Sequence, residues 1–240
     1  MSNTFYGEEF YNWQREASFS SAVNMLPIVF EIVKPKSVID VGCGVGTWLA
    51  AAKSLGAQRV VGVEGAWIKD ARMAITEPVV LADLEASIPL TDRFDLVICM
   101  EVAEHLSERR APSLISDLCG LSDVVLFGAA VPGQGGNNHV NEQWQSYWAD
   151  LFRSQGRLPY DLVRPKVWYS DKIDFWYKQN ALLYMTEQKG AELNCSDALG
   201  SILDIVHPEM SLRQDGPRDL LKKIPRATAR AFEKRLNKPG

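Results

Sequence analysis

Residues 38–48, VIDVGCGVGTW, carry the strongest structural signal in this chain. The stretch begins as an apolar run that predicts a buried β-strand, and it then has glycines at positions 42, 44 and 46. A glycine-rich turn from a strand into a helix lets the backbone approach a ligand closely and directs amide groups at its polar atoms. Asp40 lies two residues before the first glycine, so we expect a carboxylate beside this ligand.

Apolar runs and helical patterns alternate after this stretch. Further strands are expected, with helices between them, at residues 59–64, 78–83, 94–100 and 122–130. Strands that are apolar throughout and alternate with helices are typical of a parallel sheet covered by helices on both faces. Later in the chain we expect a helix over 142–156 and strands at 162–168 and 180–187.

The first part of the chain has a different pattern. Residues 8–34 carry apolar positions at helical spacing, with Pro27 as an internal break, and predict one or two helices. From about Leu212 onward, lysine and arginine outnumber the acids, which predicts a peripheral helix with a solvated basic face or, alternatively, a surface for an anionic partner. We therefore expect an N-terminal helical cap (1–36), a core (37–190) and a basic, helical C-terminal extension (191–240).

The composition is that of an ordinary globular protein. Of 240 residues, 46% are hydrophobic and 23% charged, which fits one α/β domain with decorations. The net charge of −4 makes a nucleic-acid partner an unfavoured expectation, because phosphate backbones are usually met by basic surfaces. We expect no membrane span, since no apolar run approaches roughly 18 residues. The four scattered cysteines favour reduced thiols, and with no signal-peptide pattern we expect a cytoplasmic protein; the oligomeric state stays open.

The glycine spacing separates two classes of ligand site. The dinucleotide fingerprint is G-x-G-x-x-G/A, whereas this turn reads G-x-G-x-G, with Thr47 at the place of the third small residue. The tighter spacing after Asp40 resembles the class I S-adenosylmethionine-dependent methyltransferases. Glu64 and Asp83 end the next two expected strands, where the resemblance implies one acid for the ribose hydroxyls and one for the adenine amino group. Each acid alone could instead cap a helix.

The resemblance extends beyond the glycine turn. The segments YNWQREASFSSA, FDLVICMEVAEHL and GAAVPGQGGNNHVNEQWQSYWADLF look like a bacterial group of small class I methyltransferases over residues 5–187. It implies a Rossmann-like, seven-stranded, mostly parallel sheet with helices on both faces and a donor pocket at the carboxyl ends of the strands. Arg15 would pair with the donor's carboxylate, or else form a surface ion pair. The predicted donor-binding residues are Arg15, Asp40, Gly42, Cys43, Gly44, Gly46, Trp48, Glu64, Gly65, Asp83, Leu84, Met100 and Glu101.

A second group of residues follows the fourth and fifth expected strands. Glu101, Glu104 and His105 stand at spacing i, i+3, i+4, which predicts one shared face on a helical turn. His139 follows the neighbouring fifth strand, so these four are a candidate site for Mg²⁺, Mn²⁺, Fe²⁺ or Zn²⁺. The E-x-x-E-H pattern is similar to small-RNA 2′-O-methyltransferases and to ubiquinone-pathway O-methyltransferases, which implies a metal that activates an acceptor hydroxyl. His139 matches in residue type but not in spacing.

Other roles for these residues stay open. His105 or His139 could be the catalytic base without a metal, because an alcohol needs activation to attack at neutral pH, or the cluster could be structural. Trp144, Tyr147 and Trp148 are either core residues or a platform for a sugar ring. The leading prediction is O-methylation of a hydroxylated small molecule or a sugar or glycan intermediate; the alternative is RNA 2′-O-methylation. A nucleotide-binding oxidoreductase and a non-catalytic scaffold are the remaining alternatives.

Overall fold

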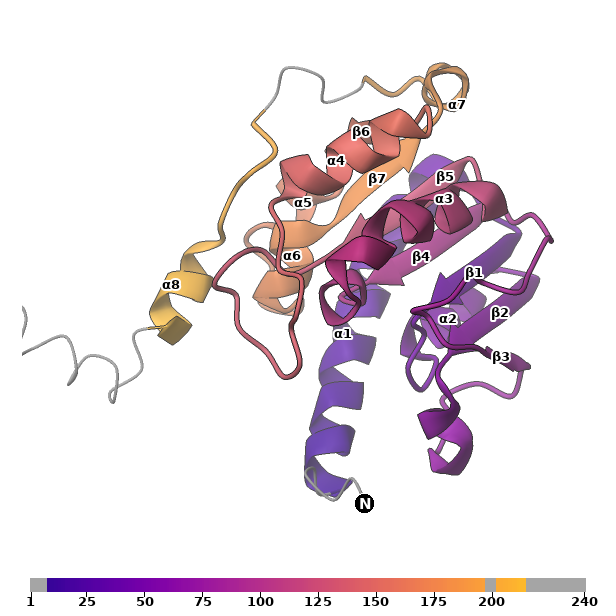
Figure 1. The fold of residues 1–240 in the computed structure, drawn as a ribbon, viewed down its shortest axis with the longest axis vertical. Coiled ribbons are helices and arrows are strands. Elements are labelled where there is room, and N and C mark those ends of the chain that lie inside the picture. Colours follow the sequence, from indigo (N-terminus) through magenta and orange to yellow (C-terminus); the bar gives the residue numbers. More distant parts are fainter. Residues whose placement is uncertain (1–7, 197–201, 215–240) are drawn as a thin grey trace, which may run out of the picture. The chain divides into compact units, whose positions relative to one another are not determined.

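The computed structural model describes residues 8–196 and 202–214, and of residues 8–16, 70 and 212–214 it describes the backbone only (Figure 1). Two compact units divide between Ile205 and Val206. The first unit contains the sheet, and the described part of the second contains helix α8 (Pro208–Gln214). The domain boundaries expected from the sequence stay predictions. Among the helices of the described chain, none has the length and apolar character that crossing a membrane requires.

A seven-stranded sheet forms the centre of the first unit (Figure 1). Its order is β3-β2-β1-β4-β5-β7-β6. Strands β1 to β5 are parallel, and β7 runs antiparallel to both β5 and β6. This confirms the predicted mostly parallel α/β sheet. The strands are β1 (Ser37–Val41), β2 (Arg59–Glu64), β3 (Val79–Leu81), β4 (Leu96–Met100), β5 (Val124–Gly128), β6 (Leu158–Tyr160) and β7 (Leu182–Met185).

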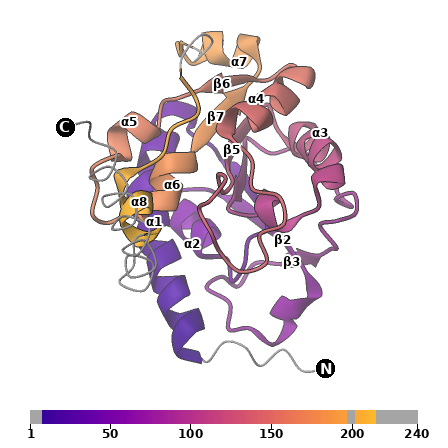
Figure 2. The same ribbon diagram turned by 60° about the vertical axis from the view of Figure 1, so that its left-hand side comes forward.

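Helices cover both faces of the sheet (Figures 1 and 2). Met25 of α1 and Leu49 of α2 belong to the apolar cluster on one face, with residues of α5 and α6. Leu114 of α3 and Phe152 of α4 belong to the cluster on the other face. The helices are α1 (Glu8–Val33), α2 (Thr47–Ser54), α3 (Ala111–Leu121), α4 (Gln145–Ser154), α5 (Arg164–Val167), α6 (Phe175–Asn180) and α7 (Glu187–Glu192), with 3₁₀ turns η1 (Ala66–Asp70), η2 (Ala103–His105) and η3 (Glu108–Arg110).

One predicted strand differs from the structure, and of the two alternatives for residues 8–34 the single helix is confirmed. The strand predicted at 162–168 is wrong, because Pro165 lies in the first turn of the short helix α5, where a missing N–H costs nothing. The buried Arg164 side chain holds this helix by donating to the Leu203 carbonyl at 2.8 Å. At the other end of the chain, α1 is one continuous helix through Pro27. The proline is exposed, while buried side chains on the opposite face, such as Met25 and Val29, hold the helix on the sheet.

Candidate active site

The glycine turn after β1 has one open position between two crowded ones. Gly42 and Gly46 adopt φ values of 79° and 85°. A Cβ atom at Gly42 would lie 2.3 Å from the nearest side-chain atom of Val102, and one at Gly46 would lie 2.8 Å from Ile75. Gly44, with φ 52°, has nothing within 4 Å of its Cβ position. The turn therefore leaves space for a ligand at Gly44 and excludes side chains on either side of it.

Glu64, the last residue of β2, points at this turn. It is 8% exposed, and its Oε2 atom accepts a hydrogen bond from Gly44 N at 2.8 Å. Its Oε1 atom accepts from Gly65 N at 2.8 Å and from Trp67 Nε1 at 3.1 Å. The carboxylate is thus fixed beside the open position of the turn, which is the orientation that a donor-binding role requires.

Asp40 lies in β1 immediately before the turn. Its side chain is 2% exposed, and its Oδ2 atom has no hydrogen-bond partner. Burial, and then the nearby Glu64 carboxylate, raise the pKa of Asp40 well above its ordinary value. A buried carboxylate oxygen without a partner is costly, so a cationic or hydrogen-bond-donating ligand at this turn would relieve that cost.

The remaining predicted donor residues lie in different surroundings. Asp83 is exposed, and its Oδ1 atom accepts from Glu85 N at 3.0 Å, so its side chain caps the following turn. Trp48 packs edge-on against Tyr177 with ring centroids 5.2 Å apart. The ring of Trp48 is 5% exposed, and its contact with the donor stays a prediction. The side chains of Cys43, Leu84 and Met100 are buried as well, and the side chain of Arg15 lies outside the described residues.

Glu101 begins the second group of predicted residues, and its backbone differs from the expected helical turn. Glu101 has φ 58°, a left-handed conformation that is uncommon for a non-glycine residue. The helix-face prediction for residues 101–105 is therefore wrong: the chain turns sharply at Glu101, and only Ala103–His105 form a 3₁₀ turn. Glu101 N donates to Gly128 O at 2.8 Å, which fixes the turn to the end of β5.

Amide side chains that the sequence analysis did not single out hold the Glu101 carboxylate. Asn180 Nδ2 donates to its Oε1 atom at 2.9 Å, and Gln134 Nε2 donates to its Oε2 atom at 2.7 Å. Gln134 Oε1 in turn accepts from Asn180 and from Gln179. These residues come from the loop after β5 and from α6, so no local pattern around Glu101 could have identified them.

Glu104 has the opposite surroundings. It is fully buried, and neither carboxylate oxygen has a hydrogen-bond partner. Burial, and then the Glu101 carboxylate, raise the pKa of Glu104 well above its ordinary value. One ligand atom each from Glu104, His105 and His139 lie within 4.8 Å of one another. A carboxylate oxygen and two imidazole nitrogens are ligands that could hold a divalent cation, and such an ion would satisfy the Glu104 oxygens.

The two histidines lie edge-on to each other, with ring centroids 4.9 Å apart. Burial, and then His139, lower the pKa of His105, while a hydrogen bond with the Asn138 backbone acts against this shift. His105 is therefore neutral at pH 7, the form that binds a metal or accepts a proton. His139 Nδ1 lies 2.9 Å from Glu142 Oε1. The structure thus brings His139 to Glu104 and His105, as predicted from the neighbouring strands.

The aromatic residues after this loop divide between two roles. Trp148 is 1% exposed and packs on Phe127, so it is part of the core. Trp144 is 40% exposed at the start of α4. Of Trp144 and Trp148, only Trp144 is exposed enough to contact a ligand.

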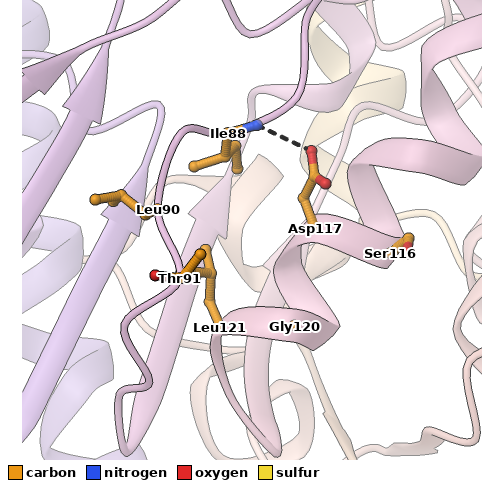
Figure 3. Close-up of a pocket in the computed structure, with 7 residues that line it drawn as sticks. All are labelled: Ile88, Leu90, Thr91, Ser116, Asp117, Gly120 and Leu121. Atoms are coloured by element: carbon orange, nitrogen blue, oxygen red, sulfur yellow. Dashed lines mark hydrogen bonds between the residues drawn. The ribbon is translucent and has the colours of Figure 1, made fainter.

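A separate cavity of about 330 Å³ lies between the segment before β4 and the end of α3 (Figure 3). Asp117 Oδ2 accepts from Ile88 N at 3.2 Å beside it. Leu121, which lines it, accepts from Phe94 N two residues before β4 begins. The cavity is therefore at the amino end of β4, whereas the glycine turn and the histidines follow the carboxyl ends of their strands.

The sheet order and the carboxylates around the glycine turn define the class I methyltransferase fold. The family model described as a methyltransferase domain matches residues 11–157, more than half of the chain. The chain therefore belongs to the methyltransferase-domain family. A search of curated protein sequences gave no match.

Solved structures share this fold at low sequence identity. The methyltransferase domain of bacterial CtHen1-C has a TM-score of 0.51 at 16% identity, over 70% of this chain and 98% of that chain. A SAM dependent methyltransferase from Archaeoglobus fulgidus has a TM-score of 0.50 at 18% identity, over 63% and 75%. Streptomyces venezuelae DesVI has a TM-score of 0.43 at 16% identity, over 54% of this chain and 58% of that chain. The chain thus spans less than two thirds of DesVI.

Proposed function

We propose that this protein transfers a methyl group from S-adenosylmethionine to a hydroxyl of a small molecule or carbohydrate, with a divalent cation held by Glu104, His105 and His139. The observation that carries the proposal is the Glu104 carboxylate, which is fully buried without a hydrogen-bond donor and lies beside two imidazoles. A stable fold rarely retains such a group unless a ligand satisfies it.

On the donor side, the chain offers negative and neutral oxygens rather than cations. Glu64 is fixed beside the open space at Gly44 and would accept from the ribose hydroxyls. Asp40 has an unpartnered oxygen for the donor's positively charged end. Asp83 would turn from its cap toward the adenine amino group. Positioning the donor in line with the acceptor supplies much of the rate of a methyl transfer, because it converts a bimolecular encounter into an aligned pair.

On the acceptor side, a bound divalent cation would hold the acceptor hydroxyl and lower its pKa. Glu104 supplies negative charge for the ion, and neutral His105 supplies a nitrogen. Glu101, the fourth ligand expected from the sequence, is already held by two amides and would serve beside the ion rather than on it. His105 is exposed, so an acceptor can reach this cluster from solvent.

Methyl transfer from labelled S-adenosylmethionine to a panel of sugars, phenols and RNA tests the proposal. The protein is first treated with a chelator and then assayed with and without Mg²⁺, Mn²⁺ or Zn²⁺. We expect transfer to a hydroxylated small molecule that depends on the added ion. Transfer that survives chelation would support His105 or His139 as a metal-free base instead, and transfer to RNA that falls steeply with salt would favour the RNA alternative.

A further inference from the structure

The loop 131–142, between β5 and α4, contains a carboxylate that the proposed chemistry does not use directly. Glu142 Oε2 accepts from Gly133 N at 2.8 Å, and Glu142 Oε1 accepts from Gly135 N at 2.9 Å. The same Oε1 atom lies 2.9 Å from His139 Nδ1. Two backbone amides of the loop therefore fix the carboxylate, and the carboxylate in turn meets one specific nitrogen of the histidine.

One face of the His139 ring also lies against this loop. A Cβ atom at Gly136 would lie 2.2 Å from His139 Nε2 and 2.4 Å from Cε1. Only a residue without a side chain allows the ring to lie where it does. The loop therefore contacts the ring twice, through Glu142 at the edge that carries Nδ1 and through Gly136 against the face of the ring.

The hydrogen bond to Glu142 decides which nitrogen of neutral His139 carries the proton. A carboxylate accepts, so Nδ1 must donate, and Nε2 is left with its lone pair. This ring lies edge-on to His105, in the group that also contains Glu104. Histidines that bind metals are commonly oriented by a carboxylate on their second nitrogen, and loss of that partner weakens metal binding by about 10–100-fold.

From this geometry we infer that Glu142 is a positioning residue, which holds His139 in the tautomer and orientation needed to bind a divalent cation. The inference rests on the proposed function in naming the cation. It adds a residue that touches neither the ion nor the substrate. It also gives the backbone amides of Gly133 and Gly135 a role in holding that residue.

The test combines Mn²⁺ titration with nitrogen NMR of the full chain. For Glu142→Ala we expect the dissociation constant for Mn²⁺ to rise by about 10–100-fold, and for Glu142→Gln, which keeps one acceptor oxygen, by less. Glu187→Ala is the matched control, because Glu187 is exposed and begins α7, which follows β7 at the amino end of β5. At a pH where the His139 imidazole is neutral, its proton should lie on Nδ1 in the wild type and shift toward Nε2 in Glu142→Ala.

Gly136→Ala gives a second route to the same result. The added methyl group should displace the His139 ring and weaken Mn²⁺ binding, whereas Gly120→Ala in α3, where a Cβ meets nothing within 4 Å, should not. Unchanged Mn²⁺ affinity in Glu142→Ala would overturn the inference. If the wild type binds no Mn²⁺ but its His139 tautomer still depends on Glu142, the proposed metal assistance fails and the orienting role of Glu142 stands.

Discussion

Glu64 and Glu104 are both buried carboxylates near the carboxyl ends of parallel strands, but their surroundings are opposite. Glu64 accepts three hydrogen bonds from residues 44–67, whereas the oxygens of Glu104 have no partner. The Glu64 carboxylate is thus satisfied by the protein alone, whereas the Glu104 carboxylate lacks hydrogen-bond donors that a ligand would supply. The same kind of substitution should therefore change turnover, ligand affinity and stability differently at these two carboxylates.

The largest effect should come from Glu104→Gln. Without its carboxylate we expect turnover to fall by about 10²–10⁴-fold, the range for loss of a group that activates the acceptor, while donor affinity stays within about twofold. The free energy of unfolding should stay equal or rise, because the wild type buries a carboxyl with no partner. Rate measurements, calorimetry with S-adenosylmethionine and urea unfolding test the three parts. Wild-type turnover in Glu104→Gln would contradict a role for Glu104 in activating the acceptor.

The next effect concerns the stability of the donor side. Gly42→Ala combines a left-handed backbone with a contact at 2.3 Å to Val102, so we expect a loss of about 2–5 kcal/mol in unfolding free energy. Gly44→Ala has the strained backbone but open space, and should cost about 1–2 kcal/mol. Urea denaturation of both variants measures the difference. Equal losses would mean that Val102 moves aside easily.

A third prediction concerns the binding of S-adenosylmethionine by Glu64. Charge-assisted hydrogen bonds are each worth about 1.5–3 kcal/mol, so Glu64→Gln should weaken S-adenosylmethionine binding by about 10–100-fold. Asp83→Asn is the matched comparison, since Asp83 is exposed and occupied with its own turn, and should have a smaller effect. Calorimetric titration decides the order. A larger loss of affinity in Asp83→Asn would mean that Asp83, after β3, contributes more to donor binding than Glu64 at the end of β2.

The sequence predicted the glycine turn and its strand better than the arrangement of residues 101–139, for a physical reason. The turn at 42–46 and the strand that precedes it are contiguous, so their spacing alone predicts a backbone that approaches a ligand. The parallel strands were likewise visible as apolar runs, although 162–168 was mistaken for a strand because its apolar residues outweighed Pro165. Local patterns identify elements, and they also identify sites built within one element and its turn.

The acceptor side depends on contacts between distant segments. The E-x-x-E-H pattern identified Glu104 and His105, but their assumed helical face does not exist, because Glu101 takes a left-handed backbone to hydrogen-bond Gly128. The amides of Gln134 and Asn180 reach Glu101 from other elements. Of the missed residues Gln134, Asn180 and Glu142, only Glu142 could have been predicted from the sequence. It lies three residues from His139 and can contact it by local geometry.

The last expected effect concerns Asp40, whose buried Oδ2 atom has no hydrogen-bond partner. Burial raises the pKa of Asp40 in the folded protein, so as pH rises the unfolded chain loses this proton first. Stability should therefore fall with rising pH above the ordinary carboxyl pKa of about 3.9, by up to about 1.4 kcal/mol per pH unit, until the raised folded pKa is reached. Asp40→Asn should remove this part of the slope. Urea unfolding between about pH 5 and pH 8 compares the two proteins, and parallel curves would mean that Asp40 is already ionised and satisfied.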